Sequence, residues 1–176
     1  VTALSEDEEG TLWVGTMGGG QQRHYQESGS FKSYRHIQGD SASLSSDMIV
    51  CLTTIEGTLW VGTYDQGVSV FDMHDSHVYH YRHSDANRNT ISNNHVAAIA
   101  RDASGVIWIG TFDGLNAFDP ITRTFHRYGM EDGLTSDAVV GILPDSHGKI
   151  WVSTSSGLNK VERIAGMGHN LKIPGP

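Results

Sequence analysis

The sequence predicts an all-β protein assembled from β-propeller blades, each blade being a sheet of four antiparallel strands. Two observations lead to this fold class. A seven-residue segment with a central tryptophan occurs four times, and its tryptophans recur at intervals of 47, 48 and 43 residues. Each copy is flanked by short β-rich runs divided by Gly, Asp, Asn and Ser, the pattern of strands linked by hairpins. No helical periodicity of useful length competes with this interpretation.

The repeated segment is the second strand of each unit. It contains all four tryptophans of the chain, and it is apolar on both faces, which is typical of a strand covered on both sides. We interpret the tryptophans as packing residues and expect the small residue two positions after each of them to leave room for an aromatic ring. A four-stranded unit cannot bury both faces alone, so it must stack on copies of itself. The copies are residues 10–16, 57–63, 105–111 and 148–154.

The other three strands of each unit surround this segment. A polar turn that ends in glycine precedes it, and such turns suit hairpins because Asp bonds its own backbone and glycine accepts a positive φ. A glycine-rich turn leads into the third strand, and the fourth strand carries an apolar or aromatic pair, as in Phe125 and Tyr128. The first strands are expected at residues 1–6, 48–53, 96–101 and 139–143.

These elements divide the chain into blades of a single propeller domain. The last unit lacks an aromatic fourth strand, so we expect an incomplete blade followed by a tail or linker. The expected blades are residues 1–47, 48–95, 96–138 and 139–164, with the tail at 165–176.

Composition limits the classes of partner. The chain has a formal net charge of −8 and no basic stripe, which disfavours nucleic acid and anionic membrane surfaces. No run of residues is apolar enough to span a bilayer, so we expect no direct membrane insertion of this segment. Cys51 is the single cysteine; it excludes an internal disulfide, and its apolar neighbours predict a buried thiol.

The repeat resembles the two-component regulator propeller family. The shared motifs are the polar turn, the Trp-Val-Gly-Thr-like strand, the Asp119-Pro120 turn, and a linker of the type Leu-Ser-Ser-Asp. The resemblance covers about residues 1–162. One departure lies in the first unit, where residues 20–25 are polar although the family has an apolar third strand. The linkers are residues 44–47, 91–94 and 134–137.

The resemblance implies a sensor propeller of hybrid histidine kinases or diguanylate cyclases, on the periplasmic or extracytoplasmic side of the membrane. Such propellers resemble seven-bladed rings. Four copies do not complete one, so we expect part of a larger ring, or a ring that another chain or further blades complete; a rarer four-bladed ring is the other alternative. Unpaired blade faces would otherwise leave apolar patches exposed.

Two sets of loops form the rim near a propeller's axis, and this rim is the default ligand surface. An aromatic ring beside Asp, Asn or Gln suits a sugar, because the ring offers a stacking face and the polar groups bind hydroxyls. These polar types also form ligand-free turns, but turns do not require aromatics. The candidate ligand-binding residues are Tyr64, Asp65, Gln66, Phe112 and Asp113 in the first set of loops, and Asp47, Asn93, Asn94 and Asp137 in the second.

Histidines and acidic turns suggest a metal, but we predict none, and no cofactor. His74, His77, His80 and His83 recur every third residue, whereas a strand alternates with period two, so their rings cannot converge. They also fall on the outermost strand, where a solvated edge is the simpler interpretation. The acidic turn at residues 7–9 lacks counterparts in the other copies with the oxygen ligands that calcium needs.

The sequence favours a binding module over an enzyme. It contains no nucleophile elbow, phosphate loop or zinc-protease motif. The leading hypothesis is a sensory module that binds a small molecule or an oligosaccharide. The alternative is a structural or assembly module without a small-molecule ligand. A third, weaker alternative is a virginiamycin B lyase-like enzyme, which shares Gly-x-x-Trp repeats but usually carries Trp-Phe-Thr at the signature.

Overall fold

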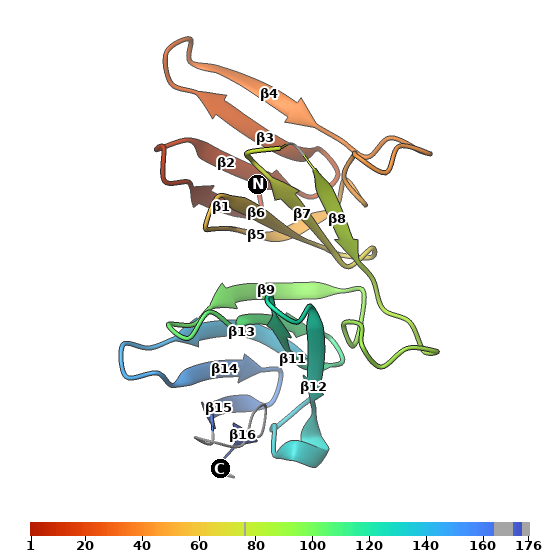
Figure 1. Ribbon diagram of the computed structural model, residues 1–176, viewed down its shortest axis with the longest axis vertical. Coiled ribbons are helices and arrows are strands. Elements are labelled where there is room, and N and C mark those ends of the chain that lie inside the picture. Colours follow the sequence, from red (N-terminus) through yellow and green to blue (C-terminus); the bar gives the residue numbers. More distant parts are fainter. Residues whose placement is uncertain (76, 164–170, 174–176) are drawn as a thin grey trace. The chain divides into compact units, whose positions relative to one another are not determined.

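The computed structural model describes residues 1–75, 77–163 and 171–173, and within them it forms four antiparallel sheets of four strands each (Figure 1). The strands of every sheet follow one another in sequence order. One short 3-10 helix, η1 (Met130–Asp132), follows the third sheet. The predicted all-β fold class, with blades of four antiparallel strands, is confirmed.

The strands have the following bounds. The first sheet consists of β1 (Ala3–Glu6), β2 (Leu12–Thr16), β3 (Gly20–Tyr25) and β4 (Ser30–Tyr34), and the second of β5 (Ile49–Ile55), β6 (Thr58–Thr63), β7 (Val68–Asp72) and β8 (Val78–Tyr81). The third sheet consists of β9 (Val96–Arg101), β10 (Ile107–Thr111), β11 (Gly114–Asp119) and β12 (Thr124–Tyr128), and the fourth of β13 (Val139–Pro144), β14 (Ile150–Thr154), β15 (Gly157–Arg163) and β16 (Leu171–Lys172).

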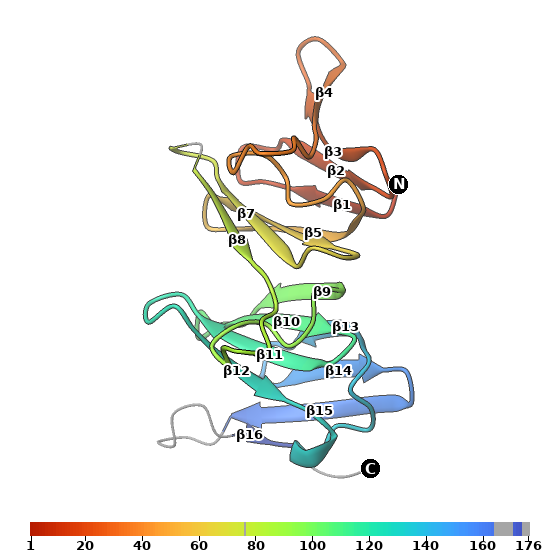
Figure 2. The same cartoon turned by 90° about the vertical axis from the view of Figure 1, so that its right-hand side faces the viewer.

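The chain divides into two compact units. The first comprises Val1–Arg82 and Asn94–Val96, and the second comprises His83–Asn93 and Ala97–Pro176. In the first unit, β1 and β2 lie against β5 (Figure 2), and the two sheets enclose a core. That core is built from Trp13, Leu44, Ile49, Leu52, Leu59 and Val61.

The second unit repeats this packing, with β10 against β13. Trp108, which is 1% exposed, occupies the same strand position as Trp13 and lies in the core that the third sheet shares with the fourth. The tryptophan face of one blade is therefore covered by the following blade. The remaining members of this core include Leu115, Ala117, Leu134, Val139, Ile150, Val152 and Val161.

The glycines two positions after Trp13 and Trp108 make room for an aliphatic side chain, not for an aromatic ring. A Cβ built on Gly15 would lie 2.7 Å from Ile49 Cγ2, and one on Gly110 would lie 2.4 Å from Val139 Cγ1. Both partners open the first strand of the next blade. The expectation of a ring is wrong because the tryptophan lies beside that strand, and the β-branched residue fills the gap in the pleat.

An aspartate joins the polar turn to the tryptophan in three of the four blades. Trp13 Nε1 donates to Asp7 Oδ2 at 2.9 Å, and Trp108 Nε1 donates to Asp102 Oδ2 at 2.8 Å. Trp151 does the same with Asp145 at 3.1 Å. The other carboxylate oxygen accepts backbone N–H groups of the turn. The turn and the core residue of a blade are thus held by one side chain.

The second blade closes its first hairpin differently. Ile55 pairs with Thr58, which leaves a two-residue turn of Glu56 and Gly57, both at positive φ (44° and 73°). This is the type I′ geometry that matches the twist of a hairpin. The short turn has no place for the aspartate, and Trp60 Nε1 instead donates to Thr58 Oγ1 at 3.0 Å.

Part of the segment predicted as a tail belongs to the fourth blade. Leu171 and Lys172 pair with Arg163 and Glu162 of β15, and Ile173 is buried in the core of the second unit. Apolar Leu171 and Ile173 alternate with the exposed Lys172, which is a strand pattern. The predicted tail at 165–176 did not take this pattern into account. Residues 165–170 and 174–176 of that predicted tail lie outside the described residues.

Candidate functional site

The structure brings the two sets of candidate loops together within three blades. The linker carbonyl at the end of each blade accepts a hydrogen bond from the glycine that opens the third strand or ends the turn before it. Gly20 N donates to Asp47 O at 3.0 Å, Gly67 N to Asn94 O at 2.9 Å, and Gly114 N to Asp137 O at 2.7 Å. The rim that the sequence predicted is therefore held by the backbone.

Two of the candidate carboxylates already serve the fold. Asp47 Oδ1 accepts the backbone N–H of His36 at 2.7 Å, and Asp47 Oδ2 lies 3.6 Å from the Arg35 guanidinium. Asp137 Oδ1 accepts the backbone N–H of Met130 at 2.7 Å. In each case the carboxylate fixes the chain just after the fourth strand, which is a positioning role that turn chemistry alone did not predict.

A buried polar cluster lies beneath the rim in the third blade and again in the fourth. In the third blade, Asn116 Oδ1 accepts the backbone N–H of Ser92 at 2.8 Å, and Ser92 Oγ lies 2.8 Å from Thr111 Oγ1. Asn159 and Thr135 repeat this arrangement in the fourth blade. The sequence signal was an asparagine two positions after the glycine that opens the third strand.

Three candidate residues of the first unit line one open pocket of about 470 Å³, which we name the Asp47 pocket. Asp65 and Gln66 approach it from the β6–β7 turn and Asp47 from the linker. Gln66 is anchored by its backbone N–H, which donates to Thr63 Oγ1 at 3.0 Å. The other lining residues are His36, Ser45, Ser46, Met48 and Arg82.

Tyr64 and the two asparagines lie outside the lining of this pocket. The Tyr64 side chain is 49% exposed, and its ring lies 4.4 Å from the ring of His95. Burial lowers the pKa of His95, so this imidazole is neutral at pH 7. Asn93 and Asn94 both belong to the linker at residues 91–94, and the first is part of the second unit whereas the other is part of the first. The exposed ring of Tyr64 thus stands at the start of the turn that carries Asp65.

The remaining two carboxylates line a second pocket of about 530 Å³ in the second unit, which we name the Asp113 pocket. Asp113 and Asp137 share it with Arg88, Arg127 and Glu131. Burial is the main reason that the pKa of Arg127 is lowered. Its guanidinium Nε donates to the Thr90 carbonyl at 2.7 Å, so this arginine also holds the linker. Phe112 is 51% exposed beside this turn.

The four periodic histidines occupy separate environments. His80 Nε2 donates to the Ser41 carbonyl at 3.0 Å, and His83 Nδ1 lies 2.9 Å from the Ile91 carbonyl. The His77 ring packs on Tyr79 at 4.4 Å, and the His74 ring lies over Gly57. Across residues 1–75, 77–163 and 171–173, no group of three His, Cys, Asp or Glu side chains could hold a metal ion.

The thiol of Cys51 is enclosed between neighbouring strands. Its sulfur lies 4.0 Å from the Val96 carbonyl, and a Cβ on Gly62 would come within 2.5 Å of it. Burial raises the pKa of Cys51 to about 12, so the thiol stays protonated at neutral pH. A nucleophilic role requires the thiolate, and the sulfur is therefore a packing atom.

Comparison with known proteins agrees with this architecture. The family model described as "two component regulator propeller" matches residues 1–18, 90–113 and 133–156, each of which spans a signature strand or the linker before one. Three segments of the chain are therefore similar to this propeller repeat. Among curated proteins, none matches the sequence.

Solved structures resemble these propeller repeats in fold. One is the extracellular domain of a hybrid two-component system from B. thetaiotaomicron, with 18% identity and a TM-score of 0.73; the alignment covers 98% of this chain and 29% of that one. Virginiamycin B lyase from Staphylococcus aureus has 12% identity and a TM-score of 0.70, with 99% and 55% covered. A computationally designed protein has 15% identity and a TM-score of 0.62, with 98% and 89% covered. The chain therefore spans only part of its natural structural relatives.

The described part of the chain contains no helix that is long and apolar enough to cross a membrane.

Proposed function

We propose that these propeller repeats form the ligand-binding part of an extracytoplasmic sensor, which receives a small molecule at the rim and passes the signal to an output domain. The family model and the extracellular two-component neighbour support the sensory context. The observation that carries the proposal is the Asp47 pocket, where a loop with an exposed aromatic meets the linker to the next blade. A ligand there would contact two blades and could change their packing.

An oligosaccharide is the ligand class that suits this pocket. Asp65 and Gln66 offer hydrogen-bond partners for hydroxyls inside the pocket, and Tyr64, which precedes Asp65 but lies outside the lining, offers a half-exposed ring for the apolar face of a sugar. Arg82 adds a donor, and His36, whose Nδ1 donates to the Leu44 carbonyl, leaves Nε2 for a ligand. Such a mixture of a stacking face and converging polar groups is typical of small-molecule sites.

We propose binding rather than catalysis. The described residues that line the two rim pockets hold the backbone or face solvent, and none combines a nucleophile with a base in hydrogen-bond contact, as covalent catalysis requires. The resemblance to virginiamycin B lyase concerns fold, and one propeller fold hosts many functions.

The proposal is tested by replacing Tyr64 and Asp65 together with alanine and titrating oligosaccharides by calorimetry. Oligosaccharide binding to the unsubstituted protein is expected, with at least a ten-fold loss in the double variant, because both the stacking face and a carboxylate are removed. Phe31→Ala is the matched control: it removes an exposed aromatic, 54% exposed, from β4. Unchanged binding in the double variant would reject the rim site. No binding to any sugar would favour the structural or assembly module.

A further inference from the structure

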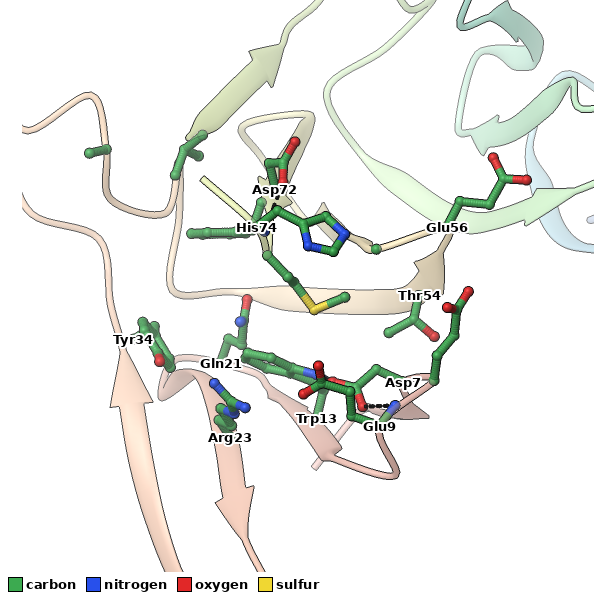
Figure 3. Close-up of a pocket in the computed structure, with 16 residues that line it drawn as sticks. Asp7, Glu9, Trp13, Gln21, Arg23, Tyr34, Thr54, Glu56, Asp72 and His74 are labelled. Carbon is green, nitrogen blue, oxygen red and sulfur yellow. Dashed lines mark hydrogen bonds between the residues drawn. The ribbon is translucent and has the colours of Figure 1, made fainter. Parts of the chain in front are cut away.

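Besides the Asp47 pocket, the first unit contains another cavity, which lies outside the rim and which the function proposed above does not use. It measures about 360 Å³ and lies between the first and second sheets, at the side of the β1–β2 turn (Figure 3). We name it the Trp13 pocket. Trp13, Gln21, Arg23 and Tyr34 line it from the first sheet, and Glu56, Asp72, Met73 and His74 line it from the second.

Gln21 and Arg23 stand where the second and third blades place apolar residues. Gln21 pairs with Gly15, and Arg23 pairs with Trp13, so both side chains leave β3 on the tryptophan face. This is the polar third strand at which the sequence departs from its family. The same two positions are held by Val68 and Val70 in β7 and by Leu115 and Ala117 in β11, all of them buried.

These two polar side chains are not satisfied by the fold. The Gln21 side chain is 1% exposed, and its Oε1 has no hydrogen-bond partner within the described residues. The buried Nε of Arg23 has none there either. Leaving a buried polar group unpaired lowers the stability of the folded protein. The unpaired acceptor of Gln21 and the unpaired donor of Arg23 lie two residues apart on one face of the strand. They therefore point to an absent partner that can both donate and accept a hydrogen bond.

The walls of the pocket define the rest of that partner. The Arg23 guanidinium lies 5.4 Å from the Trp13 ring centre, and the Tyr34 ring lies 6.1 Å from that of Trp13, which gives the pocket an aromatic side. Carboxylates surround the mouth and greatly outnumber the single guanidinium. They make the pocket electronegative, which attracts cations and repels anions. The carboxylates are those of Asp7, Glu8, Glu9, Glu56 and Asp72.

We propose that the Trp13 pocket binds a small hydroxylated amine, such as an amino sugar or an amino alcohol. A hydroxyl is the group that can donate to Gln21 Oε1 and accept from Arg23 Nε at the same time. The ammonium group pairs with carboxylates of the lining such as Glu9 and Glu56. The carbon skeleton packs on Trp13 and Met73. This site is separate from the rim site and does not depend on it.

The probes are glucosamine, galactosamine and ethanolamine, compared with neutral glucose and anionic gluconate, and the readout is the melting temperature together with calorimetry. At least one amine is expected to raise the melting temperature by mass action, with glucose weaker and gluconate inactive. The substitution Gln21→Leu introduces the residue type of β11. It is expected to leave the free protein as stable as before or more stable, and to reduce amine affinity at least ten-fold.

Leu115→Gln is the matched control in the second unit, where it should lower stability and leave amine binding unchanged. The proposal is overturned if none of the three amines binds, or if Gln21→Leu binds them as tightly as the unsubstituted protein. The Tyr64 and Asp65 double variant should keep amine binding in full. Its result therefore separates failure of this site from failure of the rim.

Discussion

At the residue scale, one carboxylate carries much of the local order of a blade. Asp102 is 6% exposed, and its Oδ1 accepts the backbone N–H groups of Ser104 and Val106. Its Oδ2 accepts the indole N–H of Trp108. Without the Asp102 carboxylate, the buried indole N–H of Trp108 and the backbone N–H groups of the turn would both lose their acceptor. The aspartate therefore links hairpin closure to core packing.

Replacing Asp102 with alanine should lower the free energy of unfolding by about 2–4 kcal/mol, because several hydrogen bonds to a charged group are lost and Trp108 is left unpaired. Asp145→Ala is the matched comparison. It removes the equivalent backbone and indole bonds around Trp151, but no counterpart of the Ser104 hydroxyl bond, and Trp151 is only partly buried, so its loss should be smaller. Urea unfolding followed by circular dichroism measures both. Equal losses would contradict the role given to burial.

His80 provides a pH-dependent contribution to stability. Burial is the largest cause that lowers its pKa below the ordinary 6.5, and the charges of Arg82 and His36 act in the same direction. The folded protein therefore binds this proton more weakly than the unfolded chain. Its full stability is present above pH 6.5 and declines as the pH falls below that value.

His80→Gln should make the loss of stability between about pH 7.5 and about pH 5.5 shallower, because the titrating group is removed. His95, whose pKa is lowered by burial as well, keeps part of the slope. Urea unfolding at the two pH values measures the difference. An unchanged slope would show that His80 does not titrate differently in the folded and unfolded states.

At the element scale, the packing of the third sheet on the fourth depends on Gly110, which has no Cβ. Gly110 faces Val139, which opens β13, and an alanine there would place its Cβ 3.2 Å from the Val139 Cβ as well as 2.4 Å from its methyl. Val139 is fully buried and β-branched, so it cannot turn away without breaking the core. The contact sets how closely the third and fourth sheets approach.

Gly110→Ala should destabilise the protein by about 1–3 kcal/mol through overpacking. Gly157→Ala is the control: there the nearest atoms are those of Thr135, at 3.4 Å or more, an ordinary contact. Thermal and urea unfolding of the two variants give the comparison. If the two substitutions were equally tolerated, the close approach at Gly110 would not limit the packing.

Most strands could be predicted because their signals are local. The expected first strand at 96–101 coincides with β9, and the signature segments contain β2, β6, β10 and β14. The Asp–Trp bond escaped prediction although its signal was present: Asp and Trp are six residues apart in three copies. Hairpin chemistry explained the aspartate and packing explained the tryptophan, so nothing in the pattern required the two side chains to meet.

At the scale of the whole molecule, the outer face of the fourth sheet lacks the cover that the equivalent Trp108 face receives. Leu143 and Leu158 are 66% and 61% exposed on the face that carries Trp151. On the first sheet, Leu4 and Phe31 are exposed to a similar degree on the face opposite Trp13. Exposed apolar groups of this kind mark interaction surfaces.

The 176-residue chain should therefore self-associate through these faces, because a blade from a second copy offers the same cover that the fourth blade gives to Trp108. Replacing Leu143 and Leu158 with glutamate should shift the chain toward monomer in sedimentation velocity. Ile121→Glu, at a residue 91% exposed in the β11–β12 turn, is the control and should not. A chain that sediments as a monomer at every concentration would contradict the prediction.

The candidate site could be predicted only in part. Loop positions follow from strand order, so the meeting of the β6–β7 turn with the following linker was predictable. Which side chains face a pocket depends on distant partners. The Asp47 carboxylate is held by the His36 backbone N–H and the Arg35 guanidinium, and the Tyr64 ring packs against the His95 ring. The Trp13 pocket arises from cross-strand register, which links Gln21 to Gly15 and cannot be read from residue types alone.

The indole bonds to the turns have a spectroscopic consequence. Each sheet contains one indole proton, and in the first, third and fourth sheets its acceptor is a carboxylate, whereas in the second it is a hydroxyl. Four proton resonances, with Trp60 displaced from the other three, would then report on four separate sheets. Their exchange with deuterium would reveal the order in which the blades open, and whether a ligand in the Trp13 pocket slows the first blade alone.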